Sequence, residues 1–223
     1  MRERRKRRNE NTVPLRGFHD GFLFAGPGAH DRLGSDAGKL LPGVRVENRA
    51  VAGRSTKSFL AEGRLQAIEE EIRPGDLLLV QFTHNDMNDK PERHTDPWTS
   101  FRDNLNIFID TALKKEAQPV MVTPLCQRIF ADGVLQDTLG EYPRVIRQLA
   151  EERSLPLMDL YAESRRVVSG LGAEKSRALY MHLAPGEFPA WPEGKEDDTH
   201  FRREGAETWA GIAAQWLKEK ELA

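Results

Sequence analysis

Asp197 and His200 are the two side chains in this sequence whose types and spacing best fit proton-transfer chemistry. They stand three residues apart, in the segment Asp197-Asp198-Thr199-His200. In a turn, this spacing lets the Asp197 carboxylate accept a hydrogen bond from Nδ1–H of His200 and leaves Nε2 free as a general base. The commoner use of any single Asp-x-x-His is a solvated acidic loop with a surface histidine. The pair therefore indicates a general base without establishing one.

Gly53 and Asn85 are candidates for hydrogen-bond donors to a substrate oxygen. A glycine at position 53 lets backbone N–H groups approach such an oxygen closely. Asn85 follows the most apolar run of the chain, so its amide can donate into a cleft at the end of a strand. Taken alone, Gly53 is better explained by an ordinary turn, and Asn85 fits an Asx turn about as well as a donor role. Only their combination with the Asp197–His200 pair favours a catalytic role for Gly53 and Asn85.

The elements that would hold these residues alternate along the chain. Short apolar runs bounded by turn residues predict strands, and amphipathic stretches predict helices. The expected strands are residues 44–47, 77–82, 120–122 and 155–160, and the expected helices are residues 58–72, 98–113, 142–152 and 204–217. This order predicts an α/β fold, a three-layer sandwich with a mainly parallel sheet and helices on both faces. In such folds ligands bind at the carboxyl ends of the strands, where Gly53 and Asn85 stand.

Composition narrows the classes of partner. The 223 residues fit one domain, and 33 basic and 35 acidic side chains nearly cancel, so we expect neither nucleic acid nor membrane as a partner. The basic residues 2–8 are expected to be a solvated tail. Cys126 is the only cysteine, which excludes a disulfide framework. No apolar run is long enough to cross a bilayer and no signal peptide is recognisable, so we expect a cytoplasmic protein.

Three motifs together resemble those of the SGNH hydrolases, in the wording typical of rhamnogalacturonan acetylesterases. They are Asn-x-Ala-x-x-Gly-Arg-Ser at residues 48–55, Gln-Phe-x-His-Asn-Asp at residues 81–86 and Asp-x-Thr-His-Phe at residues 197–201. The resemblance implies a flavodoxin-like sandwich and a carbohydrate O-acetyl esterase that uses a serine, with no metal or cofactor, on an acetylated oligosaccharide or polysaccharide.

The same resemblance assigns roles to individual residues. It implies that Gly53 N–H and the Asn85 side chain form the oxyanion hole, that His200 is the general base and that Asp197 orients it. In a family-like stretch, His182 is expected to contact substrate. Trp191 could stack on a sugar ring, although a simple anchoring contact is the commoner use of a tryptophan. One departure is Thr83, which replaces the family's usual glycine and is expected to narrow the pocket beside Asn85.

The nucleophile is unknown, because the family's Gly-Asp-Ser occurs nowhere in the sequence. Ser35 follows a glycine, but no strand precedes it and it lies close to Gly53, whereas Ser55 and Ser58 belong to the motif around Gly53. Codons for residues 30–37, read one base later, can give Met-Thr-Gly-Trp-Gly-Gln-Met, which is family-like wording. We therefore interpret residues 1–37 as an aberrant N-terminal segment, out of frame or changed by substitution, and residues 38–223 as the esterase domain.

The missing block has consequences for fold and activity. We expect the sheet to lose an edge or central strand and the chain to hydrolyse esters poorly. The alternative function is a non-catalytic saccharide-binding remnant, or an incompletely folding fragment, of such an enzyme.

Overall fold

The computed structural model describes residues 15–17, 40–41, 44 and 46–222, and for residues 15–17 it describes the backbone alone. The basic residues 2–8, Ser35 and the boundary at residue 37 lie outside this part of the chain. None of the helices in the described ranges combines the length and apolarity that a membrane crossing requires.

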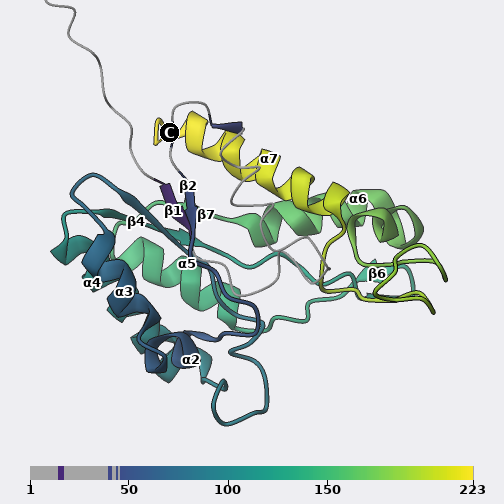
Figure 1. Ribbon diagram of the computed structural model, residues 1–223, viewed down its shortest axis with the longest axis horizontal. Coiled ribbons are helices and arrows are strands. Elements are labelled where there is room, and N and C mark those ends of the chain that lie inside the picture. The colour runs from purple at the N-terminus through teal and green to yellow at the C-terminus, as the bar shows by residue number, and fades with distance from the viewer. Residues whose placement is uncertain (1–14, 18–39, 42–43, 45, 223) are drawn as a thin grey trace, which may run out of the picture.

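A parallel five-stranded sheet forms the centre of the described fold (Figure 1). Its strands are, in spatial order, β2 (Val46–Asn48), β1 (Leu15–Gly17), β3 (Leu77–Val80), β4 (Gln118–Val122) and β7 (Leu157–Met158). Every neighbouring pair is parallel. The order 2-1-3-4-5, counted along these five strands, is that of doubly wound flavodoxin-like folds. A small antiparallel hairpin, β5 (Phe130–Ala131) and β6 (Val134–Leu135), lies apart from this sheet.

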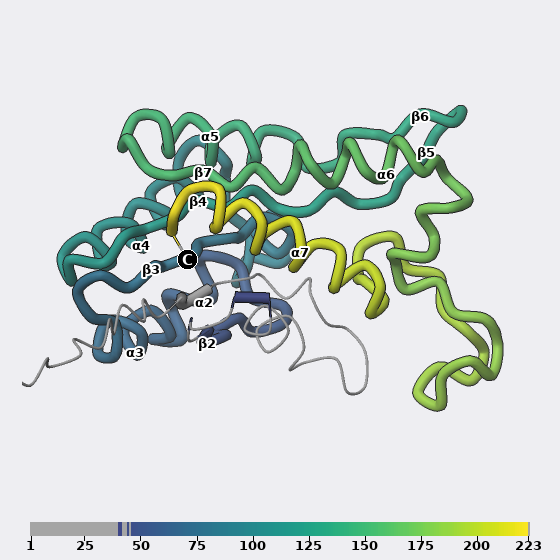
Figure 2. Tube along the Cα trace, turned by 90° about the horizontal axis from the view of Figure 1, so that it is seen from above, coloured from purple at the N-terminus to yellow at the C-terminus, as the bar shows by residue number. Residues whose placement is uncertain are grey.

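Helices cover both faces of the sheet (Figures 1 and 2). One face carries α2 (Thr56–Ala61), α3 (Arg64–Glu71), the π-helical turn η1 (Pro97–Phe101), α4 (Arg102–Lys114) and α5 (Tyr142–Glu152). The other carries α6 (Leu160–Ser176), the 3₁₀ turn η2 (Arg177–Leu179) and α7 (Arg203–Glu219). The predicted three-layer α/β class is confirmed.

Alternating side chains of the strands feed two separate cores, one on each face. Leu78 of β3 and Met121 of β4 pack into the cluster beneath α2 to α5, whereas Leu77 and Val120 pack into the cluster beneath α6 and α7. Successive strand residues point to opposite faces, so strands buried on both sides read as continuous apolar runs.

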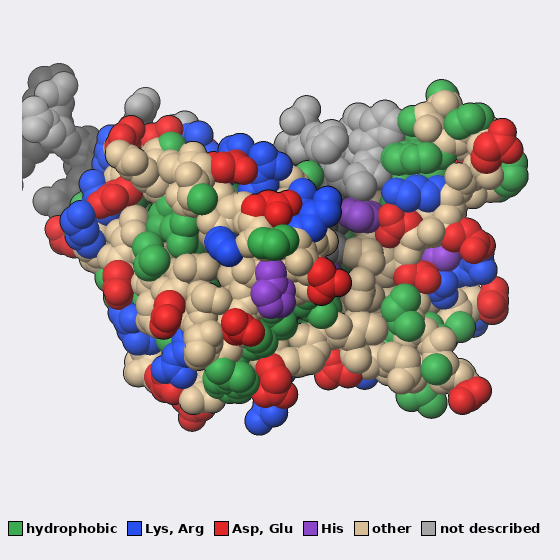
Figure 3. Space-filling model, turned by 90° about the horizontal axis from the view of Figure 1, so that it is seen from below, with side chains coloured by type: hydrophobic (Ala, Val, Ile, Leu, Met, Phe, Trp, Pro, Cys, Tyr) green, Lys and Arg blue, Asp and Glu red, His purple; other side chains and the backbone are tan. Residues whose placement is uncertain are grey.

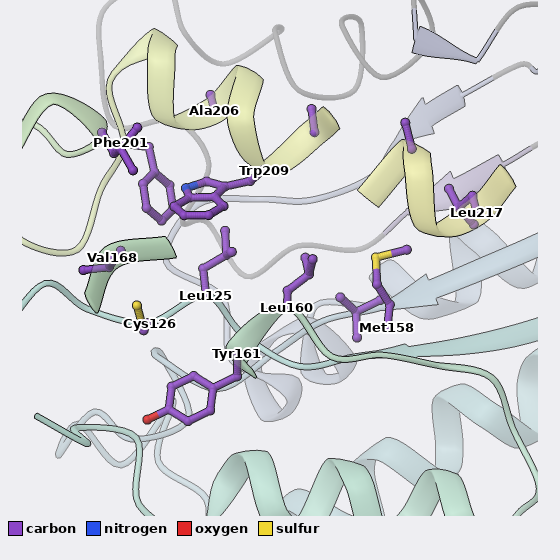
Figure 4. Close-up of a cluster of buried hydrophobic side chains, with 14 of the residues drawn as sticks. Leu125, Cys126, Met158, Leu160, Tyr161, Val168, Phe201, Ala206, Trp209 and Leu217 are labelled. Atoms are coloured by element: carbon purple, nitrogen blue, oxygen red, sulfur yellow. The ribbon is translucent and has the colours of Figure 1, made fainter. Parts of the chain in front are cut away.

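The two cores are built from different side chains. In the first, the Phe82 ring lies 5.6 Å from Phe59 and 5.1 Å from Phe108, centroid to centroid. The second is shown in Figure 4 and contains the lone cysteine, Cys126, whose carbonyl accepts a 2.7 Å hydrogen bond from Tyr180 Oη. Each helical layer is therefore fixed to the sheet by large, fully buried side chains.

Two predicted elements differ from the structure. The single helix expected at residues 58–72 is two helices, because Gly63 adopts a left-handed backbone conformation, φ +68°, between them. The strand expected at residues 155–160 is reduced to Leu157–Met158, because the Asp159 side chain accepts from Ala162 N–H and begins α6 instead.

The expected loss of a front strand is wrong. Strand β1, Leu15–Gly17, lies between β2 and β3, with Gly17 opposite both Asn48 and Leu79. The hydrogen bonds that pair β1 with its neighbours come from the backbone. Any residues that adopt an extended conformation can therefore form them. The sheet therefore keeps a central strand from the N-terminal segment.

Candidate active site

The His200–Asp197 pair has the geometry that its spacing predicts. His200 Nδ1 lies 2.8 Å from Asp197 Oδ2, and Asp197 Oδ1 accepts backbone N–H bonds from Thr199 at 2.9 Å and His200 at 2.8 Å. Because a carboxylate only accepts, Nδ1 carries the proton and Nε2 is the basic nitrogen. The turn thus holds the imidazole in the tautomer that a general base needs.

The Asp197 carboxylate is kept ionised. Burial on its own raises its pKa, but the hydrogen bonds from the His200 ring and backbone, together with Lys195 at 2.9 Å, outweigh burial and hold the pKa well below its usual range. A permanent negative charge beside Nδ1 stabilises the imidazolium that forms when His200 accepts a proton.

A second segment clamps the turn that carries this pair. Met181 N–H donates to His200 O at 2.8 Å, and Leu183 and Lys195 exchange two backbone hydrogen bonds at 2.8 and 3.0 Å. The intervening residues 183–196 project from the body of the molecule (Figure 2). The pair is therefore anchored on both sides of the projecting segment.

The start of α7 adds a close contact that only glycine permits. A Cβ atom at Gly205 would lie 2.1 Å from the carbonyl oxygen of Leu179. Beside it, the Phe201 ring packs at 4.9 Å from Tyr180 and 5.8 Å from Trp209, centroid to centroid. The residue after His200 is thus locked into the core.

His182 and Trp191, the predicted substrate contacts, lie in different surroundings. The His182 side chain is 7% exposed, and its Nε2 lies 2.7 Å from Asp198 Oδ1, which also pairs with Arg128 at 2.6 Å. Half-buried Trp191 has the Lys195 ammonium 4.7 Å from its ring centroid. His182 therefore contacts the turn at residues 197–200, called the catalytic turn below, and also lines the neighbouring cavity, whereas Trp191 is linked to Asp197 through Lys195.

The predicted oxyanion donors lie at the same sheet edge as the catalytic turn. Gly53 follows β2 and Asn85 follows β3, and residues 197–200 dock on the segment after β4, where Arg128 N–H donates to Asp198 O at 2.8 Å. Since β2, β3 and β4 run parallel in one sheet, their carboxyl ends line one edge. The sheet therefore brings the base and both donors to one side of the fold.

Gly53 has a backbone conformation that favours glycine, with φ +76°. The two serines after it, Ser55 and Ser58, form a capping box at the start of α2, in which each side chain bonds the other's backbone N–H, at 3.2 and 2.9 Å. Their hydroxyls are used to begin the helix, which agrees with excluding them as nucleophiles.

Arg93 lies next to both predicted oxyanion donors and was not foreseen from the sequence. Its Nη1 donates to Asn85 Oδ1 at 3.3 Å, and a Cβ built on Gly53 would lie 3.6 to 3.8 Å from its guanidinium. The Thr83 side chain, which is expected to narrow the pocket beside Asn85, is fully buried, and its hydroxyl donates to the Phe82 carbonyl.

Asp86 ties the two donor segments together. Its fully buried carboxylate accepts from Thr56 N–H at 3.1 Å, three residues after Gly53, and from Thr95 Oγ1 at 3.0 Å. Burial raises the pKa of Asp86 to about 7, although the hydrogen bonds from Thr56 and Thr95 act to lower it. Its place directly after Asn85 in the motif was the one sequence signal that pointed to it.

Groups suited to other ligands are few in the described ranges. No set of three or more His, Cys, Asp or Glu side chains there is arranged to hold a metal ion. A cavity of about 360 Å³ is lined by Arg177, Lys195 and Arg202, with Glu196 as its acidic side chain. Elsewhere, on the face shown in Figure 3, side chains of both charges are interspersed.

Comparisons with known proteins point to ester hydrolases. The model of the GDSL-like Lipase/Acylhydrolase family matches residues 16–208. The rhamnogalacturonan acetylesterase RhgT of Bacillus subtilis is 45% identical over 181 residues, which are 81% of this chain and 77% of that protein. The probable rhamnogalacturonan acetylesterase YesY of the same organism is 37% identical over 180 residues, 80% and 79% of the two chains. The fold resembles that of Axe2, an acetylxylan esterase from Geobacillus stearothermophilus, with a TM-score of 0.64, 19% identity and coverage of 93% of each chain.

Proposed function

Because the chain belongs to the GDSL-like lipase/acylhydrolase family, a family of serine carboxylic ester hydrolases, we propose that its fold serves to remove O-acetyl groups from pectic rhamnogalacturonan. The observation that carries this proposal is the hydrogen-bonded His200–Asp197 pair, at the same sheet edge as Gly53 and Asn85. The names of RhgT and YesY support the choice of polymer.

The residues divide the reaction as follows. In a chain that carries the family's nucleophile, the serine oxygen attacks the acetyl carbonyl carbon while His200 Nε2 accepts the hydroxyl proton and Asp197 stabilises the imidazolium. The negative charge on the carbonyl oxygen is met by Gly53 N–H and the Asn85 amide. His200 then returns the proton to the departing sugar oxygen, and water repeats the sequence on the acetyl-enzyme to release acetate and free serine.

The cavity beside the catalytic turn supports an acidic polymer. Three cationic side chains, Arg177, Lys195 and Arg202, line it. Each forms an ion pair, with Glu196, Asp197 and Glu187 respectively, and each has more N–H donors than that pair uses. Galacturonate units carry a carboxylate, which Arg and Lys bind through charge-assisted hydrogen bonds. Trp191 offers a flat apolar surface for a sugar ring at the projecting segment.

The chain in its present sequence is expected to hydrolyse acetyl esters slowly. Strand β1 ends at Gly17, and the residues that follow are Phe18-His19, where the family has Asp-Ser. Without the nucleophile, the base and oxyanion hole retain only a residual part of the rate, because a triad works as a unit.

A second candidate function is saccharide binding without catalysis. The observation that favours it is the presence of β1 without a following Gly-Asp-Ser, since the fold and sugar-facing groups then persist while the nucleophile does not. Sequencing the DNA that encodes residues 1–40 separates a frameshift from substitution. An in-frame Gly-Asp-Ser after correction supports the enzyme, and a clean frame without one supports the binding protein.

The enzymatic test compares the chain with a repaired chain, in which Phe18→Asp and His19→Ser complete Gly-Asp-Ser at positions 17–19. The original chain should release little acetate from 4-nitrophenyl acetate or acetylated rhamnogalacturonan, and the repaired chain should release more. His200→Ala should abolish that gain. A repaired, folded chain with no gain on either ester would overturn the esterase proposal, as would high turnover that survives His200→Ala.

A further inference from the structure

The side chain of Arg93 lies between the two proposed oxyanion donors. It donates from Nη1 to Asn85 Oδ1 at 3.3 Å, and its guanidinium comes within 3.6 Å of the position that a Cβ on Gly53 would occupy. One side chain thus contacts the amide of one donor and closely approaches the backbone of the other, although the donors stand on different loops.

The loop that carries Arg93 is fixed at several points. Thr95 donates to Asp86 from both its backbone N–H and its hydroxyl, each at 3.0 Å, and Lys57 Nζ donates to Pro91 O at 2.6 Å. Arg93 N–H itself donates to the carbonyl of Lys90 at 2.9 Å. Because its loop is tied to α2 and to buried Asp86, Arg93 holds a defined position.

The hydrogen bond to Oδ1 decides which way the Asn85 amide faces. An asparagine side chain has an acceptor oxygen and a donor nitrogen on opposite sides of one plane. A guanidinium only donates, so it selects the orientation in which Oδ1 faces Arg93 and Nδ2–H faces away. It also polarises the amide, because hydrogen bonds in a chain strengthen one another.

Arg93 differs from other arginines of the described ranges in its pairing. Within the described ranges its guanidinium pairs with no carboxylate, whereas neighbouring Arg54 pairs with Glu62 and Arg102 with Glu152. A cation beside a developing oxyanion lowers the energy of the transition state more than that of the neutral ester.

We propose that Arg93 is the positioning residue of the oxyanion hole: it orients the Asn85 amide through Oδ1 and holds a positive charge against the two donors. The inference rests on the proposed function for its catalytic meaning. The orientation of Asn85, however, can be measured whether or not the chain hydrolyses esters.

The first test reads the Asn85 side chain directly. In ¹H–¹⁵N NMR spectra of the original chain, with the Asn85 side-chain NH₂ signals assigned through Asn85→Asp, Arg93→Met should shift these signals and reduce their order. Arg93→Lys should restore them in part, because lysine keeps a donor but loses the planar fork. Arg102→Met is the matched control, since it removes an arginine that pairs with Glu152 instead, and should leave them unchanged.

The second test separates rate from binding in the repaired chain. Arg93→Met should lower kcat for 4-nitrophenyl acetate by roughly tenfold, less than the roughly hundredfold cost of losing an oxyanion donor outright, with KM little changed. Unchanged Asn85 signals in a folded Arg93→Met protein would overturn the inference and leave the proposed function intact. A raised KM with normal kcat would also overturn it. If the repaired chain were inactive, the proposed function would fail, while the NMR result would still decide the orienting role.

Discussion

Replacing Asp86 with asparagine should remove a pH dependence from the stability of the fold. The Asp86 carboxyl group is fully buried, and burial raises its pKa from 3.8 to about 7 against the opposing hydrogen bonds from Thr56 and Thr95. A group with a raised pKa binds its proton more readily in the folded than in the unfolded state. Its protonation therefore stabilises the fold at low pH.

The sign and size of the effect follow from that shift. Between pH 3.8 and about 7 the unfolded chain loses the Asp86 proton while the folded chain keeps it, so the stabilisation is complete below pH 3.8 and disappears as pH rises through about 7. A shift of about three pKa units corresponds to roughly 4 kcal/mol of unfolding free energy. Asparagine does not titrate, so the Asp86→Asn protein lacks this contribution at every pH.

Urea unfolding of both proteins from pH 4 to pH 8 measures the effect. The free energy of unfolding of the parent minus that of Asp86→Asn should fall by roughly 4 kcal/mol across this range, and the subtraction cancels the titration of all other groups. Asp89→Asn, at an exposed position on the same loop, is the control for the loss of a carboxylate. A difference that stays constant with pH would refute the reasoning, because it would mean that Asp86 is ionised throughout.

Three other predictions concern the catalytic turn and the two cores. In the repaired chain, His200→Ala should depress kcat for 4-nitrophenyl acetate more than Asp197→Ala, because His200 moves the proton and Asp197 only orients it; equal losses would contradict this order. Phe108→Ala should lower the free energy of unfolding in urea by about 3 to 5 kcal/mol, since its ring is fully buried among other phenylalanines, and a loss below about 1 kcal/mol would show that the core is not closely packed. Gly205→Ala should lower the melting temperature by several degrees, equivalent to about 1 to 3 kcal/mol, because the new methyl group overlaps the Leu179 carbonyl; an unchanged melting temperature would disprove that contact.

The central strands were predictable because their sequence pattern reflects burial on both faces. Residues 77–80 and 120–122 pack into two cores at once, which a continuous apolar run allows. Strand β1 was not predictable, because three residues paired through their backbone leave little pattern in the side chains.

The helices show where local pattern is insufficient. Gly63 stands within an otherwise amphipathic stretch, and its left-handed conformation depends on the packing of α2 against α3. Helix α6 was missed because few of its residues are buried, notably Leu160, Tyr161 and Val168, and Gly172 interrupts its helical backbone. A weakly amphipathic helix gives a weak periodic signal.

In the candidate site, contacts between residues close in sequence were predictable, and contacts between distant residues were not. Asp197 and His200 interact across one turn, so their spacing alone predicted the hydrogen bond at 2.8 Å. Arg93 reaches Asn85 only because the intervening loop folds back onto buried Asp86. Contacts of that kind depend on the folded chain, and spacing does not reveal them.

The reactivity of the single thiol, Cys126, reports on local opening of the fold. Cys126 is 2% exposed and lies against Tyr180, one residue before the segment that clamps the catalytic turn. A thiol reagent can therefore modify it only when this region separates from α6 and α7, by partial or global unfolding. Comparing the labelling rate with the global unfolding equilibrium would show whether the part of the fold that holds His200 opens as an independent unit or only together with the whole sheet.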